Sequence, residues 1–429
     1  MPMATMSQIT KLVSALGAGE QRKGAVRKST ASAQRNPQHR AEARSSSRLV
    51  GLAEKQADAV RGLRVAIVHD WIYAHGGAEL VVEQLHKLFP DAPIYTSYCA
   101  PEWRSRLDGK VVTGWLQFWP FRALRKYIPF LRIIWFTNLR LNNYDLVISS
   151  SGAEAKGIKV PKGTLHVNYC HAPTHYYWSR YDEYMDHPGF GAFDWLARFG
   201  LRVLVGPLRH WDLKAARRPD HMIANSTHIQ QEIKKYYGRD STVIFPPVHF
   251  ERFQKPENVA KKRSGFLVSG RQTPYKRFDV AVLAANIAQA PLTVIGDGPD
   301  HKRLQAMAGP TVTFLGRVSN DVLEHEFGRA EALIFPGLDD FGITPVEAMA
   351  AGTPVIAYKA GGAFDYVQPN VTGQFFDKQS PETLALVLQK FDPTLYNHAN
   401  ISQFAQKFSP ATFRENITEF LDNLDNKIA

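Results

Sequence analysis

Residues 63–88 read LRVAIVHDWIYAHGGAELVVEQLHKL, and this stretch decides the fold class. Its first part, 63–70, is a nearly continuous apolar run of the kind that is buried on both faces of a parallel sheet. The glycine pair Gly76 and Gly77 follows, and a helical pattern then continues through Leu88. A strand, a glycine turn and a helix in this order are typical of the first unit of a nucleotide-binding α/β domain.

The same alternation of strand and helix repeats in two series along the chain. In the first series, further strand-like runs stand at 92–97, 146–150, 165–169 and 221–224. A polar linker punctuated by prolines, 246–263, separates the two series. In the second series, strands are predicted at 265–270, 292–295, 312–315, 332–335 and 354–357, and helices at 278–289 and 345–351. Each series therefore predicts a doubly wound parallel sheet.

These patterns divide the chain into four predicted segments. They are a disordered basic tail at 1–62, a Rossmann-like domain at 63–250, a second Rossmann-like domain at 251–409, and a C-terminal helix at 410–429 that packs back toward the first domain. The tail has no aromatic residue and is rich in Ala, Ser, Gln and Arg. Organellar transit peptides share this composition, although a solvated tail is the simpler interpretation.

Charge and composition exclude several classes of protein. The 429-residue chain has a formal net charge of +12, but residues 1–64 contribute +8 of it through 12 basic and 4 acidic side chains. The rest of the chain is an ordinary, mildly basic globule, which weakens the case for a nucleic-acid binder. Two cysteines, Cys99 and Cys170, exclude a disulfide scaffold and a cysteine-rich zinc site. No run approaches the roughly 18 apolar residues of a membrane-spanning helix, and the N-terminus lacks the apolar core of a secretory signal.

Two loops of the second series contain residues suited to phosphate binding or to tight turns. Arg271 and Lys276 lie five residues apart, directly after a predicted strand. A guanidinium fork and an ammonium group so placed can grip a diphosphate, although on these residues alone a solvated basic loop is an equal alternative. The next strand is followed by Gly-Asp-Gly-Pro at 296–299, which by itself indicates only a turn.

The segment 335–348, FPGLDDFGITPVEA, is the most specific motif. Asp339 stands eight residues before Glu347, and the proline between them suits the first turn of a helix that contains Glu347. The backbone N–H groups of 341–343 then approach a helix N-terminus, which is a ready anion site. Carboxylates can accept hydrogen bonds from sugar hydroxyls while amides hold phosphates, so the segment suits a sugar nucleotide. The alternative is that Asp339 and Asp340 cap the helix and that Glu347 is exposed.

With these motifs in place, the chain resembles a retaining glycosyltransferase of family 4, in the mannosyltransferase-like branch that builds bacterial surface polysaccharides. The resemblance runs in family order over about residues 63–425. It is carried by residues 68–71, 76–79, 144–151, 169–173, 224–226, 270–271, 275–277, 296–299, 314–317 and 339–347. It implies an α/β protein with the GT-B fold, in which two Rossmann-like domains face a central cleft.

The resemblance also implies roles for residues that match the family motifs. Gly76 and Gly77 would let the backbone approach the donor diphosphate. Arg271 and Lys276 would neutralise that diphosphate and stabilise charge on the departing nucleotide, which is the expected main catalytic effect. His171 would lie near the donor sugar and the reaction centre.

Further matching residues are implied to bind the rest of the donor. Glu347 would bind the ribose hydroxyls, Arg317 would lie near the nucleobase, and Asp339 would hold the transferred sugar. The backbone amides that assist belong to Phe341, Gly342 and Ile343. The family usually has Glu where this chain has Asp339, one methylene shorter, so the donor sugar is more open than the type of reaction; Asp340 could substitute after a small loop shift. His69 and Asp70 are weaker candidates for a role in the site.

The expected function is transfer of mannose from GDP-mannose to a lipid-linked or polysaccharide acceptor in cell-surface glycan synthesis. A UDP-sugar-dependent transferase of the same fold is the alternative within this class. The family's fold requires no metal and no other cofactor, and no cluster in the sequence looks like a metal site. A nucleic-acid-binding protein that uses the basic tail, and a catalytically silent GT-B scaffold, are the alternatives from other classes.

Two stretches suggest contact with a membrane. Residues 109–144 contain no acidic residue and mix basic with aromatic side chains, and residues 196–218 contain several cations around the single acid Asp212. Such a mixture on amphipathic helices suits the interface of an anionic bilayer, although the aromatics can instead form the core with the cations as its rim. Acceptors in the family branch are typically lipid-diphosphate-linked sugars. We therefore expect a cytoplasmic protein that is peripheral on the inner face of the cell membrane.

Overall fold

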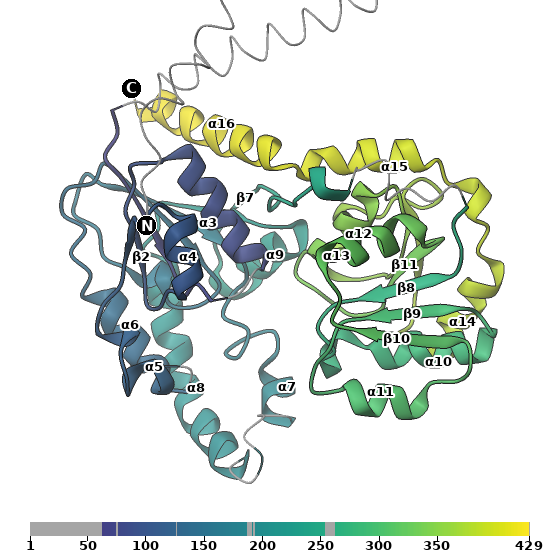
Figure 1. Ribbon diagram of the computed structural model, residues 1–429. Coiled ribbons are helices and arrows are strands. Elements are labelled where there is room, and N and C mark those ends of the chain that lie inside the picture. Colours follow the sequence, from purple (N-terminus) through teal and green to yellow (C-terminus); the bar gives the residue numbers. More distant parts are fainter. Residues whose placement is uncertain are drawn as a thin grey trace, which may run out of the picture. The chain divides into compact units, whose positions relative to one another are not determined.

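Two parallel sheets, one for each predicted series, organise the chain (Figure 1). The structure, a computed structural model, describes residues 62–73, 76–125, 127–186, 191, 194–253 and 262–428, with side chains to residue 424. The tail predicted at 1–62 thus lies almost wholly outside the described residues. The predicted fold class, an α/β protein with two doubly wound halves, is confirmed.

The first sheet has seven strands in the order β3-β2-β1-β4-β5-β6-β7. They are β1 (Val65–His69), β2 (Ile94–Thr96), β3 (Val111–Val112), β4 (Leu146–Ser151), β5 (Leu165–Cys170), β6 (His221–Ala224) and β7 (Thr242–Val243). β1 lies inside the sheet, where Ile67 pairs in register with Ile94 of β2 and Ile148 of β4. All of its residues are buried, as expected for an apolar strand covered on both faces.

The second sheet has six strands in the order β10-β9-β8-β11-β12-β13. They are β8 (Phe266–Ser269), β9 (Leu292–Ile295), β10 (Val312–Gly316), β11 (Ala332–Phe335), β12 (Val355–Tyr358) and β13 (Gly373–Phe376). All pairings in both sheets are parallel. Parallel neighbours need crossover connections, and helices supply them here.

Helices connect the strands of each sheet. The first half contains α3 (Gly77–Leu88), α4 (Pro101–Arg106), α5 (Phe121–Leu124), α6 (Pro129–Thr137), α7 (Tyr181–Asp186), α8 (Asp194–Ala216) and α9 (Thr227–Glu232). The second half contains α10 (Phe278–Ala288), α11 (His301–Met307), α12 (Asn320–Arg329), α13 (Ile343–Ala350), α14 (Pro381–Lys390) and α15 (His398–Ala405), followed by α16 (Pro410–Ile428).

The second sheet has a core on each face. Phe266 and Val268 of β8 join one buried cluster, with α10 and α14, whereas Leu267 joins the other, with α13. Successive side chains of a strand point to opposite faces, so the apolar run of β8 supplies both cores. In Figure 1, α10 and α14 accordingly lie on the opposite side of this sheet from α12 and α13.

The C-terminal helix α16 packs against the first half of the chain. Phe413, Ile417, Leu421 and Leu424 lie three or four residues apart and join the buried cluster that contains Leu85 of α3. Burying side chains of this kind stabilises a fold by roughly 1.5–3 kcal/mol each. Residues 60–429 form one compact unit that contains both sheets, so the predicted domain boundaries stay a prediction.

Each sheet has one point where the strand order reverses. It lies between β1 and β4 in the first sheet and between β8 and β11 in the second. Ligands of doubly wound sheets bind beyond the carboxyl ends of the strands at such a point. Three of the four loops at these points, those after β1, β8 and β11, carry residues that the sequence predicts for the site.

Three strands, β3, β7 and β13, are not predicted from the sequence. Each is two to four residues long and lies at the edge of its sheet. An edge strand of this length has neither a long apolar run nor enough residues to show alternation, so the pattern that reveals the central strands is absent.

Candidate active site

The loops that follow β9, β8 and β11 pack against one another through their backbones. The N–H of Gln272 donates to the carbonyl of Asp297 at 3.0 Å. A Cβ atom at Gly337 would lie only 3.0 Å from the Cα atom of Lys276, so glycine permits the close approach of the β8 and β11 loops. The two predicted donor-binding motifs of the second half and the predicted turn at 296–299 therefore meet beside the reversal point of its sheet.

Lys276 and Asp339 form an ion pair across two of these loops. Their side chains are only 20% and 13% exposed, so the pair is partly shielded from solvent. Arg271 is exposed, and among the described residues no ion-pair or hydrogen-bond partner of its guanidinium is found. The two predicted diphosphate ligands thus differ, since Lys276 already has a carboxylate partner and Arg271 does not.

Helix α13 begins directly after Gly342, and no side chain caps it. The alternative that Asp339 and Asp340 cap this helix is therefore wrong, and its first N–H groups have no side-chain cap. Glu347 lies on α13 and is half-buried, so the alternative of an exposed Glu347 is also wrong. Burial raises the pKa of Glu347 to about 7, against a weaker opposing effect of Arg252.

Replacing Gly342 by alanine is expected to destabilise the protein by about 1–3 kcal/mol and to weaken nucleotide binding. Gly342 has a φ of +94°, and a Cβ atom there would lie 2.7 Å from the Tyr366 hydroxyl oxygen and 3.1 Å from the Phe335 ring. Urea unfolding and calorimetric titration with GDP measure the two effects. Gly163→Ala is the matched control, because Gly163 has a φ of +95° but a Cβ atom there would meet no other atom within 4 Å. Equal losses in both variants would contradict a steric role for Gly342.

The other two residues predicted at the start of α13, Phe341 and Ile343, make different contacts. The Phe341 side chain is 3% exposed and packs on the rings of Tyr366 and Phe408, so it serves the core. Ile343 lies against the glycine turn of the first half, because a Cβ atom at Gly77 would be 3.0 Å from Ile343 Cγ1. At Gly76, a Cβ atom would be 2.9 Å from the Glu79 carboxylate. The structure thus brings the predicted glycine turn next to the start of α13.

Arg317 lies at the outer side of the same loops. Its side chain is 85% exposed and its Nε is 4.0 Å from the Asp297 carboxylate. Because Asp297 belongs to the loop after β9, this weak pair places Arg317 beside the predicted donor residues while leaving most of its guanidinium in solvent.

His171 follows β5 and contacts the reversal point of the first sheet. Its Nε2 is 2.8 Å from Ser150 Oγ, and the ring of His69 lies edge-on at a centroid distance of 6.1 Å. His69 Nδ1 is in turn 2.8 Å from the Ser150 carbonyl. Burial, and to a lesser degree His69, lowers the pKa of His171 to about 3. His171 is therefore neutral at physiological pH and acts as a hydrogen-bonding group rather than as a cation.

Asp70, a weaker candidate in the sequence, organises the loop after β4. Its carboxylate accepts hydrogen bonds from the N–H groups of Gly152, Ala153 and Ala155 at 2.8, 2.9 and 2.7 Å. Burial and the neighbouring Glu154 raise its pKa to about 6. With these backbone donors in place, Asp70 is a positioning residue for the loop.

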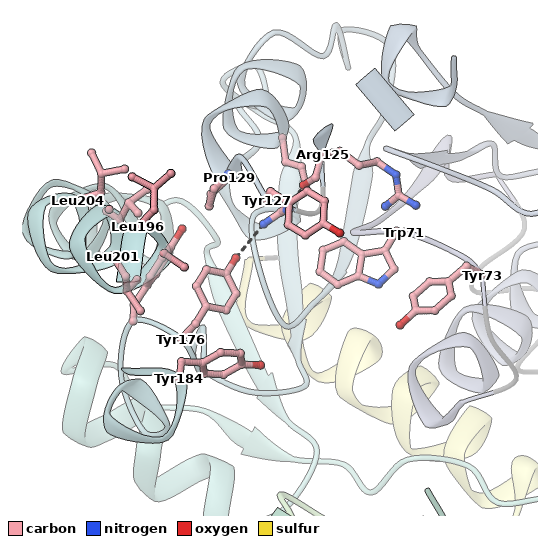
Figure 2. Close-up of a pocket in the computed structure, with 15 residues that line it drawn as sticks. Trp71, Tyr73, Arg125, Tyr127, Pro129, Tyr176, Tyr184, Leu196, Leu201 and Leu204 are labelled. Atoms are coloured by element: carbon pink, nitrogen blue, oxygen red, sulfur yellow. Dashed lines mark hydrogen bonds between the residues drawn. The ribbon is translucent and has the colours of Figure 1, made fainter. Parts of the chain in front are cut away.

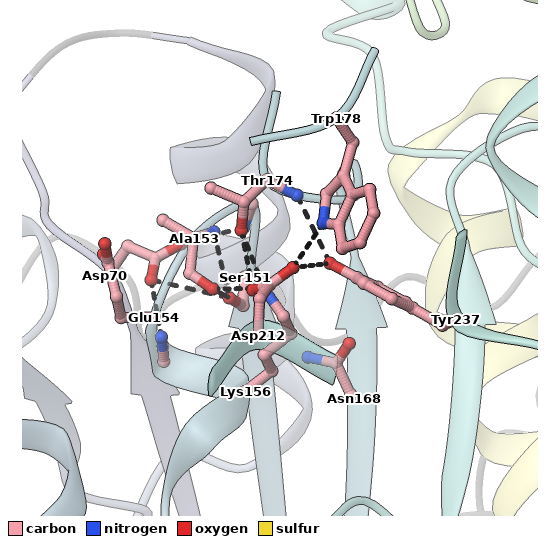
Figure 3. Close-up of polar contacts among 12 residues, drawn as sticks. Asp70, Ser151, Ala153, Glu154, Lys156, Asn168, Thr174, Trp178, Asp212 and Tyr237 are labelled. Carbon is pink, nitrogen blue, oxygen red and sulfur yellow. Dashed lines mark hydrogen bonds and ion pairs between the residues drawn. The ribbon is translucent and has the colours of Figure 1, made fainter. Parts of the chain in front are cut away.

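A buried polar network fixes the segment after β5 (Figure 3). At its centre Asp212 of α8 pairs with Lys156 at 2.7 Å, and both side chains are 0% exposed. Asp212 also accepts hydrogen bonds from Trp178 Nε1 at 2.8 Å, the Tyr237 hydroxyl at 2.7 Å and the Thr174 hydroxyl at 3.0 Å. Burial lowers the pKa of Lys156, but Asp212 outweighs this and raises it above its ordinary value.

Asp340 connects the loop after β11 with the first half of the chain, a link that the sequence analysis missed. Its carboxylate is 2.8 Å from His175 Nε2 and 3.7 Å from Arg180, and its carbonyl accepts a hydrogen bond from Ser226 Oγ at 2.6 Å. Burial raises the pKa of Asp340, but His175 and Arg180 lower it to about 2. From the sequence, Asp340 is expected only as a helix cap or as a substitute for Asp339, because no local pattern marks a partner 165 residues away.

Two acidic side chains of the site already have partners within the protein, since Asp339 pairs with Lys276 and Asp340 lies beside His175 Nε2 and Arg180. Across the residues described above, no group of three or more His, Cys, Asp or Glu residues is arranged to hold a metal ion. The site as built offers cations, backbone amides and carboxylates to a polar ligand.

Two family models match consecutive parts of the chain. The model for Glycosyltransferase Family 4 matches residues 75–252, and the model for Glycosyl transferases group 1 matches residues 249–398. The first match covers most of the seven-stranded half, and the second covers the whole six-stranded sheet.

Curated relatives match about two fifths of the chain. A GDP-mannose-dependent alpha-mannosyltransferase of Mycolicibacterium smegmatis is 32% identical over 193 residues, which is 42% of this chain and 50% of the relative. A D-inositol 3-phosphate glycosyltransferase of Streptomyces scabiei is 28% identical over 216 residues, 43% of this chain and 48% of the relative. The matched region thus spans about half the length of these relatives.

A solved structure shares the fold. The Anabaena protein HepE, determined in complex with UDP, is similar with a TM-score of 0.61 and 18% identity, over 83% of this chain and 100% of that one. This likeness extends across both sheets. Because two family models follow one another over residues 75–398 and the fold agrees, the chain belongs to the family 4 glycosyltransferases and has the GT-B fold.

Proposed function

We propose that this chain is a retaining glycosyltransferase that moves mannose from GDP-mannose to a lipid-linked or polysaccharide acceptor in cell-surface glycan synthesis. A UDP-sugar is the alternative donor. The observation that carries the proposal is the ion pair of Lys276 and Asp339 at the reversal point of the second sheet, between the loop that also carries Arg271 and the loop that leads into the helix of Glu347. The name of the mycobacterial relative supports GDP-mannose as the first donor to test.

In this proposal the two cations act on the donor diphosphate in different ways. Arg271 is exposed and meets the diphosphate first as a bidentate fork. Lys276 exchanges its partner Asp339 for a phosphate oxygen, which releases the Asp339 carboxylate to accept hydrogen bonds from the sugar hydroxyls. Both cations then stabilise the negative charge that develops on the departing nucleotide, assisted by the amides at the start of α13.

In this proposal, neutral His171 contacts the sugar as it is presented to the acceptor. Its Nε2 is occupied by Ser150, so only Nδ1 is left for a substrate hydroxyl. Glu347 binds the ribose hydroxyls in this scheme, and Arg317 contacts the nucleobase. No step uses a metal or another cofactor.

Nucleotide binding is expected to weaken as the pH falls through about 7. Glu347, whose pKa is raised to about 7, is ionised above that pH and protonated below it, and a neutral carboxyl accepts weaker hydrogen bonds from ribose. The dissociation constant for GDP should rise roughly three- to ten-fold from pH 8 to pH 6 in calorimetric titrations. Glu347→Gln should bind weakly at both pH values. A full pH response retained in Glu347→Gln would contradict the assignment.

Nucleotide release from each donor tests the reaction itself. Purified protein should release GDP from GDP-mannose faster than UDP from UDP-glucose, and a chelator should leave the rate unchanged. Faster release from UDP-glucose would favour the alternative donor, and release from neither donor would contradict both. Binding of DNA or RNA that survives Glu347→Ala would instead favour the nucleic-acid alternative.

We further propose that the protein associates peripherally with the inner face of the cell membrane. Among the described helices, none combines the length and the apolar character needed to cross a bilayer. The two basic and aromatic stretches do expose large apolar side chains, at Trp115, Phe118, Trp119, Phe121, Tyr127, Phe130 and Phe199. Trp135 and Phe136, in contrast, are buried. For these two residues, the alternative that the aromatic side chains belong to the core is correct. Sedimentation with vesicles that contain anionic lipid would detect the association.

A further inference from the structure

A cavity of about 690 Å³ lies within the first half of the chain (Figure 2). Residues near the start of α6 and residues of α8 form two of its walls, and aromatic residues from the loops after β1 and β5 complete it. It is lined by Trp71, Tyr73, Arg125, Tyr127, Pro129, Arg132, Tyr176, Tyr177, Tyr184, Leu196, Ala197, Gly200, Leu201, Leu204 and Leu208. None of the residues predicted to bind the donor is among them, so this cavity is a separate site.

The two ends of the cavity differ in chemistry. Figure 2 shows the Arg125 guanidinium with Trp71 and Tyr73 at one end, and Leu196 and Leu204 of α8 at the other. A ligand that fills the cavity therefore meets a cation at one end and hydrocarbon at the other.

Arg125 is a buried cation without a counter-charge. Its side chain is 5% exposed, and its Nε has no hydrogen-bond partner. The guanidinium stacks on the Tyr98 ring at 4.2 Å, but no carboxylate among the described residues lies within 4.0 Å of it. Burial lowers the pKa of Arg125, yet a guanidinium stays protonated in proteins. Burying a charge without a partner costs free energy. An anionic ligand beside Arg125 would offset this cost, and the described residues supply no such anion.

Arg132, in the same cavity wall, shows the contrasting case. Its guanidinium donates to the two Glu154 carboxylate oxygens at 2.7 and 2.8 Å and to the Tyr176 hydroxyl at 2.9 Å. It also lies 5.3 Å from the Trp71 ring centroid. The protein thus neutralises Arg132 and uses it to hold two aromatic walls in place, whereas Arg125 is left for a ligand.

The apolar end of the cavity continues onto the surface of α8. Trp195, Phe199 and Val203 are 66%, 63% and 56% exposed, beside the lining leucines of the same helix. Contiguous exposed apolar side chains mark interaction sites, and a hydrocarbon chain leaving the cavity would cover them.

We propose that this cavity binds the acceptor as an anionic amphiphile, namely a lipid phosphate whose phosphate pairs with Arg125 and whose hydrocarbon chain lies along the leucines of α8. A phosphate ester suits this end of the cavity because a guanidinium presents several N–H donors in a rigid fork that matches phosphate oxygens. The identification of this amphiphile as the acceptor rests on the proposed function; the binding site itself does not.

Binding of simple amphiphiles tests the site without the natural acceptor. Dodecyl phosphate, inorganic phosphate and dodecyl maltoside are titrated separately below the micelle concentration, with calorimetry as the readout. Dodecyl phosphate should bind at least about ten-fold more tightly than either other probe, because only it has both the charge and the chain. Equal affinity for dodecyl maltoside, or for inorganic phosphate, would overturn the proposal.

Variants at the two ends separate the two contributions. Arg125→Ala should weaken dodecyl phosphate binding about 10- to 100-fold, and Leu201→Ser should weaken it without changing the affinity for inorganic phosphate. Arg122→Ala is the matched control, because Arg122 is exposed, three residues away, and does not line this cavity. Unchanged binding by Arg125→Ala, or an equal loss in Arg122→Ala, would overturn the proposal.

GDP titration of the same variants keeps the two hypotheses apart. Arg125→Ala should bind GDP like the parent protein, which also shows that it is folded. Donor turnover without Arg125-dependent amphiphile binding would overturn the cavity assignment alone. Amphiphile binding without donor turnover would support the cavity and overturn the proposed function.

Discussion

Lys276→Ala is expected to lower the rate of sugar transfer at saturating donor by about 100- to 1000-fold. The ammonium group is proposed to stabilise charge on the departing nucleotide, and removing one such preorganised group from other enzymes has an effect of this size. Its partner Asp339 would also lose its counter-charge. Initial rates of nucleotide release from GDP-mannose measure the change, and Arg271→Ala should show a loss of the same order.

Lys302→Ala is the control for that experiment. Lys302 is an exposed residue of α11 in the same half of the chain, so its loss should change the rate less than two-fold, as expected for a surface substitution. Lys276→Arg should recover part of the activity, since it restores the charge with a different shape. A Lys276→Ala variant that keeps a tenth or more of the parent rate would contradict the role of Lys276 in stabilising the departing nucleotide.

Lys156→Ala is expected to reduce the free energy of unfolding by about 3–5 kcal/mol. The substitution leaves Asp212 buried without its cation and also removes the hydrogen bond from Lys156 Nζ to the Thr174 hydroxyl at 2.9 Å. Because this network fixes the segment after β5, which carries His171, activity should fall together with stability. Urea unfolding monitored by tryptophan fluorescence gives the difference.

An exposed ion pair provides the comparison for Lys156. Lys234 and Asp240 are 2.8 Å apart with side chains 63% and 94% exposed, so Lys234→Ala should cost less than about 1 kcal/mol. The double variant Lys156→Met with Asp212→Asn removes both buried charges and should be more stable than Lys156→Ala alone. Similar losses for Lys156→Ala and Lys234→Ala would show that burial does not strengthen this pair.

Much of the second half could be predicted because its signals are local. The strands Leu292–Ile295 and Ala332–Phe335 have the bounds that their apolar runs predict, since each run is short and bounded by proline, glycine or a charged residue. The loops that follow them hold the glycines and acids of the donor motifs. A local backbone preference and a nearby apolar run require no knowledge of the rest of the fold.

The two basic and aromatic stretches show which features local sequence patterns do not predict. In sequence, Arg125 and Arg132 are equivalent cations among aromatic residues. In the structure, Arg132 is paired with Glu154 and Arg125 has no carboxylate partner among the described residues, although both are buried. Likewise Asp212, the single acid of its stretch, is a buried anchor rather than part of a solvated face. Burial depends on which parts of the fold pack over a residue, and its neighbours along the chain do not reveal this.

The sequence by itself determined the two series of parallel strands and the loops that carry the predicted donor residues, because periodicity, glycines and strand ends act over a few residues. Only the tertiary structure decided which side chains meet. Lys276 and Asp339 are 63 residues apart, and His175 and Asp340 are 165 apart. Such pairs, and the unpaired Arg125, arise when strand order brings distant loops together and packing excludes water from them.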